Sequence, residues 1–133
     1  MENDSGRRAY FTIIKNEEWV IGAVVLGHSL RKSKTEATLV CQVGAAVSSE
    51  SRVLLATIYD LVENANEYVF PDSNYNNFQD VPKRLEFSFR RLNAWRRTEF
   101  DRITYLDSDL VILKNIDSLF ELPGVVAPRE YDF

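Results

Sequence analysis

The sequence predicts an α/β fold in which a mostly parallel sheet is flanked by helices. Short runs rich in β-branched and aromatic residues alternate with segments whose apolar residues recur at helical spacing. This strand and helix alternation is typical of parallel sheets, because parallel strands need a crossover between them. The length of 133 residues is about that of one domain, and the 45% hydrophobic and 27% charged content is ordinary for a globular chain.

The first half of the chain contains three expected strands and two expected helices. Each strand is an apolar, β-branched or aromatic run, and the last of them is stopped by Pro71. The first helix places basic residues at its carboxyl end, where they suit the helix dipole, and Ser48 or Ser49 can cap the second. The expected strands are residues 9–14, 38–43 and 67–70, and the expected helices are residues 19–31 and 48–64.

The second half begins with a polar stretch, residues 72–82, which has loop composition. Helical spacing returns over residues 85–95, where Trp95 is expected in the core. Two strands are expected next, at residues 102–106 and 111–113, on either side of an acidic turn. A short capped segment at residues 115–120 follows, and we expect Asp117 to belong to this capping turn.

Charge and cysteine content restrict the class of partner and the compartment. Sixteen Lys and Arg against 20 Asp and Glu give a net charge of −4 and a pI near 5.0, which argues against general binding to nucleic acid or anionic membranes. Cys41 is the one cysteine and reads as a buried, inert strand thiol. Residues 1–8 form a polar tail and no run of 18 apolar residues occurs, so a cytoplasmic protein is expected.

The acidic turn is the most informative stretch for function, because Asp107 and Asp109 are acids set within apolar surroundings. In an extended backbone these two side chains project to the same side and can converge where the strand ends. Two converging carboxylates suit Mn²⁺ or Mg²⁺, which keeps sites open for phosphate oxygens. The loop at residues 15–19 is expected at the same carboxyl edge of the sheet, where α/β proteins bind ligands. A solvated acidic turn is the alternative.

Several segments together resemble glycosyltransferase family 8, the glycogenin-like and galactinol synthase-like enzymes. The most specific are Y-L-D-S-D and, after a short gap, L-K-N-I-D-S-L-F. A-Y-F-T-I with Asn16 and Trp19, then G-A-V-V-L-G-H-S-L and R-L-N-A-W, match upstream patterns. The resemblance implies a Rossmann-like fold of the nucleotide-diphospho-sugar transferase type. It covers residues 9–128 and corresponds to the N-terminal, nucleotide-binding half, so residues 9–133 are expected to be a truncated donor-binding domain.

The resemblance implies retaining transfer of a hexose from a UDP-sugar to an unknown protein, polyol or glycan acceptor. It assigns Mn²⁺ or Mg²⁺ to Asp107 and Asp109, whereas the family's histidine ligand and acceptor-side residues have no counterpart here. His28, the one histidine, lies in the first helix and does not match that ligand. Oligomer formation is a fair expectation. The positions that match nucleotide-sugar contacts are Ile13, Lys15, Asn16, Trp19, Arg84, Arg91, Asp107, Ser108 and Asp109.

Some of these residues have other readings. Trp19 can cover the core at a helix start, and Arg91 can lie on a solvated helix face. Asp107 can also be the nucleophile of a phosphatase related to haloacid dehalogenase, although that motif normally opens its domain. A third hypothesis is a nucleotide-sugar-binding fragment without catalysis. The catalytic residue is not identified by the sequence.

Overall fold

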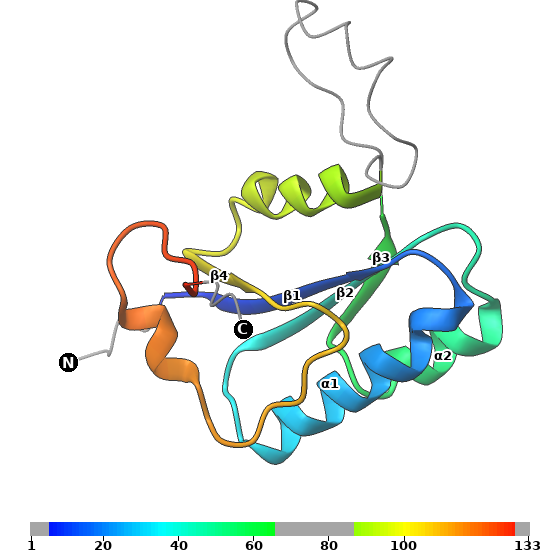
Figure 1. Cartoon of the computed structure of the whole chain (residues 1–133), viewed down its shortest axis with the longest axis horizontal. Helices are drawn as coiled ribbons and strands as arrows, with labels where there is room; N and C mark the ends of the chain where they lie inside the picture. The colour runs from blue at the N-terminus through cyan, green and yellow to red at the C-terminus, as the bar shows by residue number, and fades with distance from the viewer. Residues whose placement is uncertain (1–5, 66–86, 130–133) are drawn as a thin grey trace, which may run out of the picture.

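The structure of the chain is a computed structural model that describes residues 6–65 and 87–129. Its centre is a parallel sheet of four strands in the order β3-β2-β1-β4 (Figure 1). The strands are β1 (Arg8–Ile14), β2 (Thr38–Val43), β3 (Leu61–Asn64) and β4 (Arg102–Tyr105). The prediction of an α/β fold with a parallel sheet and flanking helices is therefore confirmed.

Helices cover both faces of the sheet (Figure 1). On one face lie α1 (Val20–Lys32), which follows the short 3₁₀ turn η1 (Glu17–Trp19), and α2 (Ser49–Ala56). On the other face lies the 3₁₀ helix η4 (Phe87–Arg96). None of the helices in the described ranges is long and apolar enough to cross a bilayer.

Two apolar clusters hold these layers together. The larger cluster packs α1 and α2 against the sheet through residues such as Leu26, Leu30 and Leu55, all with 1% or less of their surface exposed. The smaller cluster joins Phe11 and Val40 to Ala94 of η4. Cys41 lies buried in the larger cluster, as predicted.

Strand register brings three loops to one edge of the sheet. Ile14 is paired with Val43, and Phe11 is paired with Tyr105. The backbone beyond each strand therefore emerges at the same carboxyl edge. Gly44 is required there, because a Cβ at this position would collide with the carbonyl oxygen of Lys15. The predicted meeting of the first loop and the acidic turn at one edge agrees with this arrangement.

The segment after α2 differs from the prediction. The helix expected over residues 48–64 ends at Ala56, and the strand is Leu61–Asn64. Asp60 explains the change, because its N–H donates to Leu39 O (2.9 Å) and its carboxylate accepts the Leu39 N–H (2.7 Å). These bonds pull the chain into the sheet, which local periodicity cannot reveal. The predicted strand at residues 67–70 and loop at 72–82 lie outside the described residues.

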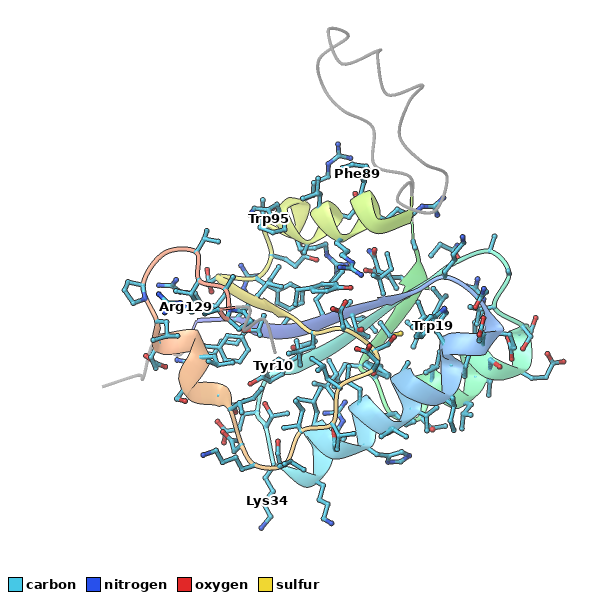
Figure 2. All side chains as sticks on the ribbon, in the orientation of Figure 1. Tyr10, Trp19, Lys34, Phe89, Trp95 and Arg129 are labelled. Atoms are coloured by element: carbon cyan, nitrogen blue, oxygen red, sulfur yellow. The ribbon has the colours of Figure 1, made fainter. Side chains whose placement is uncertain are left out.

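The helical segment before β4 is also different from expectation. It is a 3₁₀ helix over Phe87–Arg96, and Trp95 is 67% exposed, so the expected core position is wrong. A 3₁₀ helix turns every three residues, so side chains spaced for an α-helix no longer share one face. Asn93 and Ala94 are buried in its place. Figure 2 shows Trp95 on η4, turned away from the sheet.

Residues 111–113 were expected to form a strand, and they do not. Ile112 packs against the larger apolar cluster and its N–H donates to Ser29 Oγ of α1 (3.0 Å), while Val111 and Leu113 are exposed. The alternating pattern is therefore real, but the segment packs on a helix and joins no strand. The expected capped segment is the 3₁₀ turn η5 (Asp117–Glu121).

Candidate active site

The acidic turn continues directly from β4. Leu106 still follows the sheet, since its N–H donates to Phe11 O (2.9 Å), and Asp107 is the first exposed residue beyond it. The backbone then turns, with the Leu110 N–H donating to Asp107 O (3.3 Å). Asp107 and Asp109 thus share one tight turn and do not lie on the extended backbone from which their convergence was predicted.

Asp107 is held by two donors on the side of the sheet covered by η4. Its Oδ1 accepts a hydrogen bond from the Tyr105 hydroxyl (3.1 Å) and lies 3.3 Å from Arg91 Nη2. The Arg91 guanidinium also lies over the Tyr105 ring, 5.3 Å from its centroid. Burial raises the pKa of Tyr105 well above its usual value, so the hydroxyl stays protonated and remains a donor.

Ser108 and Asp109 face the opposite helix layer. Ser108 is 9% exposed, and a Cβ at Gly22 of α1 would lie 2.5 Å from Ser108 O. Glycine at this position therefore lets α1 approach the turn. Asp109 lines a largely apolar pocket of about 180 Å³ with Ile21, Val25 and Leu110. Ligand sites commonly occupy roughly 300–1,000 Å³, so this pocket alone does not hold a nucleotide sugar.

The loop after β1 supplies the other side of the candidate site. Lys15 is exposed, Asn16 is half-buried, and Trp19 has 45% of its surface exposed. The Asn16 Oδ1 atom is buried without a hydrogen-bond partner among the described residues. Figure 2 shows Trp19 near the carboxyl ends of the strands. This exposure leaves part of the Trp19 ring accessible to a ligand, and it is also compatible with a ring that covers the core at the start of α1.

Glu17 fixes the shape of that loop. Its carboxylate accepts from the Ser48 N–H (2.9 Å), from Ser48 Oγ (3.1 Å) and from Ser51 Oγ, at the start of α2. These bonds, the backbone one first, lower the pKa of Glu17. The Ser48 side chain in turn caps α2 by accepting the Ser51 N–H (3.2 Å). Hydrogen bonds therefore hold the loop after β1 against the start of α2.

The structure brings most predicted site residues to the same edge. Asp107 and Arg91 are in contact, and Lys15, Asn16 and Trp19 follow the neighbouring strand. Ile13 is 7% exposed, so its side chain offers a ligand little surface. Arg84 lies outside the described residues. Within the described ranges, no three His, Cys, Asp or Glu side chains are grouped as a metal site would require.

Three residues that support the site were not predicted for it. Tyr105 binds Asp107 through its hydroxyl, Gly22 admits the backbone of the turn, and Ser29 anchors the segment that follows. Gly22 and Ser29 belong to the glycine- and serine-containing pattern in the first helix, but nothing local indicates what they contact. Their role depends on the packing of α1 across the turn.

Asp117 holds the far end of the same segment. Its carboxylate accepts hydrogen bonds from the Tyr10 hydroxyl (2.8 Å), Thr35 Oγ1 (2.7 Å) and, at 3.4 Å, Asn115 Nδ2 and the Glu36 N–H. Its own N–H donates to Asn115 Oδ1 (2.9 Å), which agrees with the predicted turn. Burial tends to raise the pKa of Asp117, but these hydrogen bonds outweigh it and lower the pKa.

Comparison with known proteins agrees with this arrangement. The profile of "Glycosyl transferase family 8" matches residues 11–125. The chain is 34% identical over 119 residues to a glycogenin of Neurospora crassa, covering 89% of this chain and 17% of that protein. It is 32% identical to glycogenin-1 of Caenorhabditis elegans, covering 92% of this chain and 28% of that protein. An inositol phosphorylceramide glucuronosyltransferase of Arabidopsis thaliana is 29% identical, with 90% and 21% covered.

The chain thus spans less than a third of the length of these three relatives. The family match nevertheless includes the second half of β1, the acidic turn and the segment anchored by Asp117. The chain belongs to glycosyl transferase family 8.

Proposed function

We propose that the chain is the donor-binding part of a hexosyltransferase that uses a UDP-sugar and retains configuration at the transferred carbon. Residues 9–133 would form this partial domain, and the acceptor would be a protein, polyol or glycan. The observation that carries the proposal is the position of Asp107 at the carboxyl edge of the sheet, in contact with Arg91. The loop with Asn16 and Trp19 follows the neighbouring strand at that edge. Asp107 is thus available to bind a metal, Arg91 to bind the diphosphate and Trp19 to stack on the base.

The carboxylates of the turn have the donor chemistry that a divalent metal requires. Asp107 and Asp109 are both exposed and offer hard oxygen ligands. Mg²⁺ and Mn²⁺ are commonly bound by one or two carboxylates, with phosphate oxygens and water as the other ligands. Two acids are therefore enough if the donor's diphosphate completes the coordination. When bound, the metal would stabilise negative charge on the leaving diphosphate. Members of this family generally use such a metal.

The chain's own residues would bind and orient the donor. Arg91 can contact the diphosphate through two parallel N–H donors. The exposed Trp19 ring can stack on the base. The backbone of Lys15 and Ser108 would lie beside the bound nucleotide at the carboxyl edge of the sheet. A positively charged group beside the leaving diphosphate lowers the cost of the charge that develops there.

Substitution of Asp109 by Asn tests the proposal. We expect wild-type chain to bind UDP in a Mn²⁺-dependent manner, measured by isothermal titration calorimetry. Asp109→Asn should weaken this binding by more than about tenfold, because a neutral amide is a poor ligand for a hard cation. Asp101→Asn is the matched control, since Asp101 is an exposed acid at the opposite end of β4. Equal UDP binding with and without Mn²⁺ would overturn the metal site.

Turnover separates the enzyme from a fragment that binds the donor without transfer. The second candidate function is donor binding alone, because the chain spans less than a third of the length of the relatives it matches. Release of UDP from UDP-glucose or UDP-galactose, dependent on Mn²⁺ and lost in Asp109→Asn, would establish catalysis. Binding without such release would favour the second candidate. Family membership decides against the haloacid dehalogenase alternative.

A further inference from the structure

We propose that Arg91 acts as the counter-cation of Asp107 when no metal is bound, and that the metal ion displaces it. The displaced guanidinium then becomes available to the diphosphate of the donor. Arg91 is thus a positioning residue that opposes the binding of metal alone and favours the binding of the nucleotide in the presence of metal. This inference rests on the proposed metal site at Asp107 and Asp109.

The contacts of Asp107 support the first half of this inference. Two groups contact the same carboxylate oxygen, Oδ1: Arg91 Nη2 forms an ion pair with it at 3.3 Å, and the Tyr105 hydroxyl donates a hydrogen bond at 3.1 Å. A dication that coordinates this carboxylate is brought close to the Arg91 guanidinium, and the two positive charges repel each other. Metal binding at Asp107 therefore opposes the contact between Arg91 and this carboxylate.

The contact is weak enough to be broken. The side chains of Arg91 and Asp107 are 47% and 50% exposed, respectively. Water screens the charges of such exposed pairs, and their measured stabilities are small. A divalent cation carries twice the charge of a guanidinium, so its attraction to the Asp107 carboxylate is stronger than that of Arg91 in this exposed ion pair. The exchange of Arg91 for the metal is thus energetically accessible, unlike the rupture of a buried ion pair.

The Tyr105 ring explains why the released guanidinium would remain near the site. Arg91 lies 5.3 Å from the centroid of that ring, within the range of a cation–π contact. This contact does not depend on Asp107. A guanidinium that loses Asp107 can therefore stay stacked on Tyr105 and turn its N–H donors toward a phosphate. The side chain of Tyr105 is fixed in turn, because its ring packs against the smaller apolar cluster.

The inference predicts effects of opposite sign for one substitution. Arg91→Gln should bind Mn²⁺ alone about three to ten times more tightly than wild type, because the competing charge is gone. In saturating Mn²⁺, the same variant should bind UDP about three to ten times more weakly, because a phosphate donor is lost. A merely solvated Arg91 would change neither affinity, and a merely phosphate-binding Arg91 would change only the second.

The experiment is a Mn²⁺ titration followed by the electron paramagnetic resonance signal of the free ion, which disappears on binding. Wild type, Arg91→Gln, Arg91→Lys and Arg102→Gln would be compared at low ionic strength, with circular dichroism to confirm folding. Arg102→Gln removes the same charge from the opposite end of β4 and should behave as wild type. Arg91→Lys keeps the charge and should restore the wild-type Mn²⁺ affinity to within about twofold.

Failure of the inference can be distinguished from failure of the proposed function. Unchanged or weaker Mn²⁺ binding by Arg91→Gln, beside measurable binding by wild type, would overturn the role of Arg91 and leave the metal site standing. If Arg91→Gln binds Mn²⁺ more tightly but binds UDP with unchanged affinity, the proposed contact of Arg91 with the diphosphate is wrong. No Mn²⁺ binding by wild type, with or without UDP, would overturn the proposed function and this inference together.

Discussion

Asp117 shows how much structure a single carboxylate can organise. It receives hydrogen bonds from β1 through Tyr10, from the segment before β2 through Thr35, and from its own turn through Asn115. The Phe120 ring adds a contact with Tyr10, 4.8 Å between ring centroids. The N-I-D-x-L-F block therefore anchors the segment that leads away from the acidic turn. Its role in this chain is to hold the backbone, and it need not touch a ligand.

Removal of the Asp117 carboxylate should destabilise the fold. Asp117→Ala leaves several partly buried donors without an acceptor, so we expect a loss of about 2 kcal/mol in the free energy of unfolding near neutral pH. Chemical denaturation of both proteins would measure this loss. Ser118→Ala, at an exposed neighbouring position, should change stability by less than about 0.5 kcal/mol.

The effect of Asp117 should also depend on pH. Because hydrogen bonds lower the pKa of Asp117 in the folded chain, the unfolded chain binds a proton more readily. The stabilisation is therefore complete above the unfolded pKa, near 4, and is lost as the pH falls through the lower folded value. The stability difference between wild type and Asp117→Ala should shrink below about pH 4. A constant difference across that range would contradict the assigned bonds.

The sequence identified candidate residues for the site, but it did not show which of their side chains are in contact. Asp107, Asp109 and Arg91 could be named from motif and spacing, and Asp107 and Arg91 are in contact. The Tyr105 hydroxyl and the unpartnered Asn16 Oδ1 could not be foreseen. Both depend on which way a side chain points after the chain turns, and the sequence contains no local signal for that.

At the scale of elements, the approach of α1 to the acidic turn decides how the turn is held. Gly22→Ala would place a methyl group 2.5 Å from Ser108 O, and a backbone oxygen cannot move aside as a flexible side chain can. In an exposed helix the same change would stabilise by up to about 1 kcal/mol. Here we expect a net loss of about 1–2 kcal/mol, because the helix and the turn must separate.

Thermal or chemical denaturation would measure the effect of Gly22→Ala, with UDP binding in Mn²⁺ as a second readout of the displaced turn. His28→Ala is the control on the same helix, since His28 is exposed, and should change little. A Gly22→Ala chain that is more stable than wild type would show that α1 and the turn do not pack as closely as described.

The boundaries of the elements show where sequence periodicity stops being informative. The ends of β1 and β2 were predicted to within a residue, because the run of β1 is bounded by Arg8 and Lys15 and that of β2 ends at Gly44. The end of α2 was not, since Asp60 terminates it through bonds to Leu39. Residues 111–113 alternate as a strand would, but α1 is their partner. Only tertiary contacts distinguish these cases.

At the scale of the whole molecule, Cys41 reports on the integrity of the sheet. Its side chain is fully buried in the larger apolar cluster, and burial raises the pKa of the thiol to about 12. A thiol reagent needs both access and a thiolate. We therefore expect native chain to react with an aromatic disulfide reagent only as fast as the sheet opens. Chain unfolded in concentrated guanidinium chloride should react at once and release one equivalent of the reagent's thiolate. Equally fast labelling of native chain would contradict the buried position of Cys41.

The sequence by itself determined the class of fold, the buried strands β1 and β2 and the resemblance to the family, because these follow from local composition and from short motifs. The tertiary structure decided the strand that follows α2, the exposure of Trp95, and the partners of Asp107. Each of these depends on contacts between residues far apart in the chain. The acids of the turn could thus be recognised from their spacing, whereas the contact between Arg91 and Asp107 forms only when η4 and β4 are packed together.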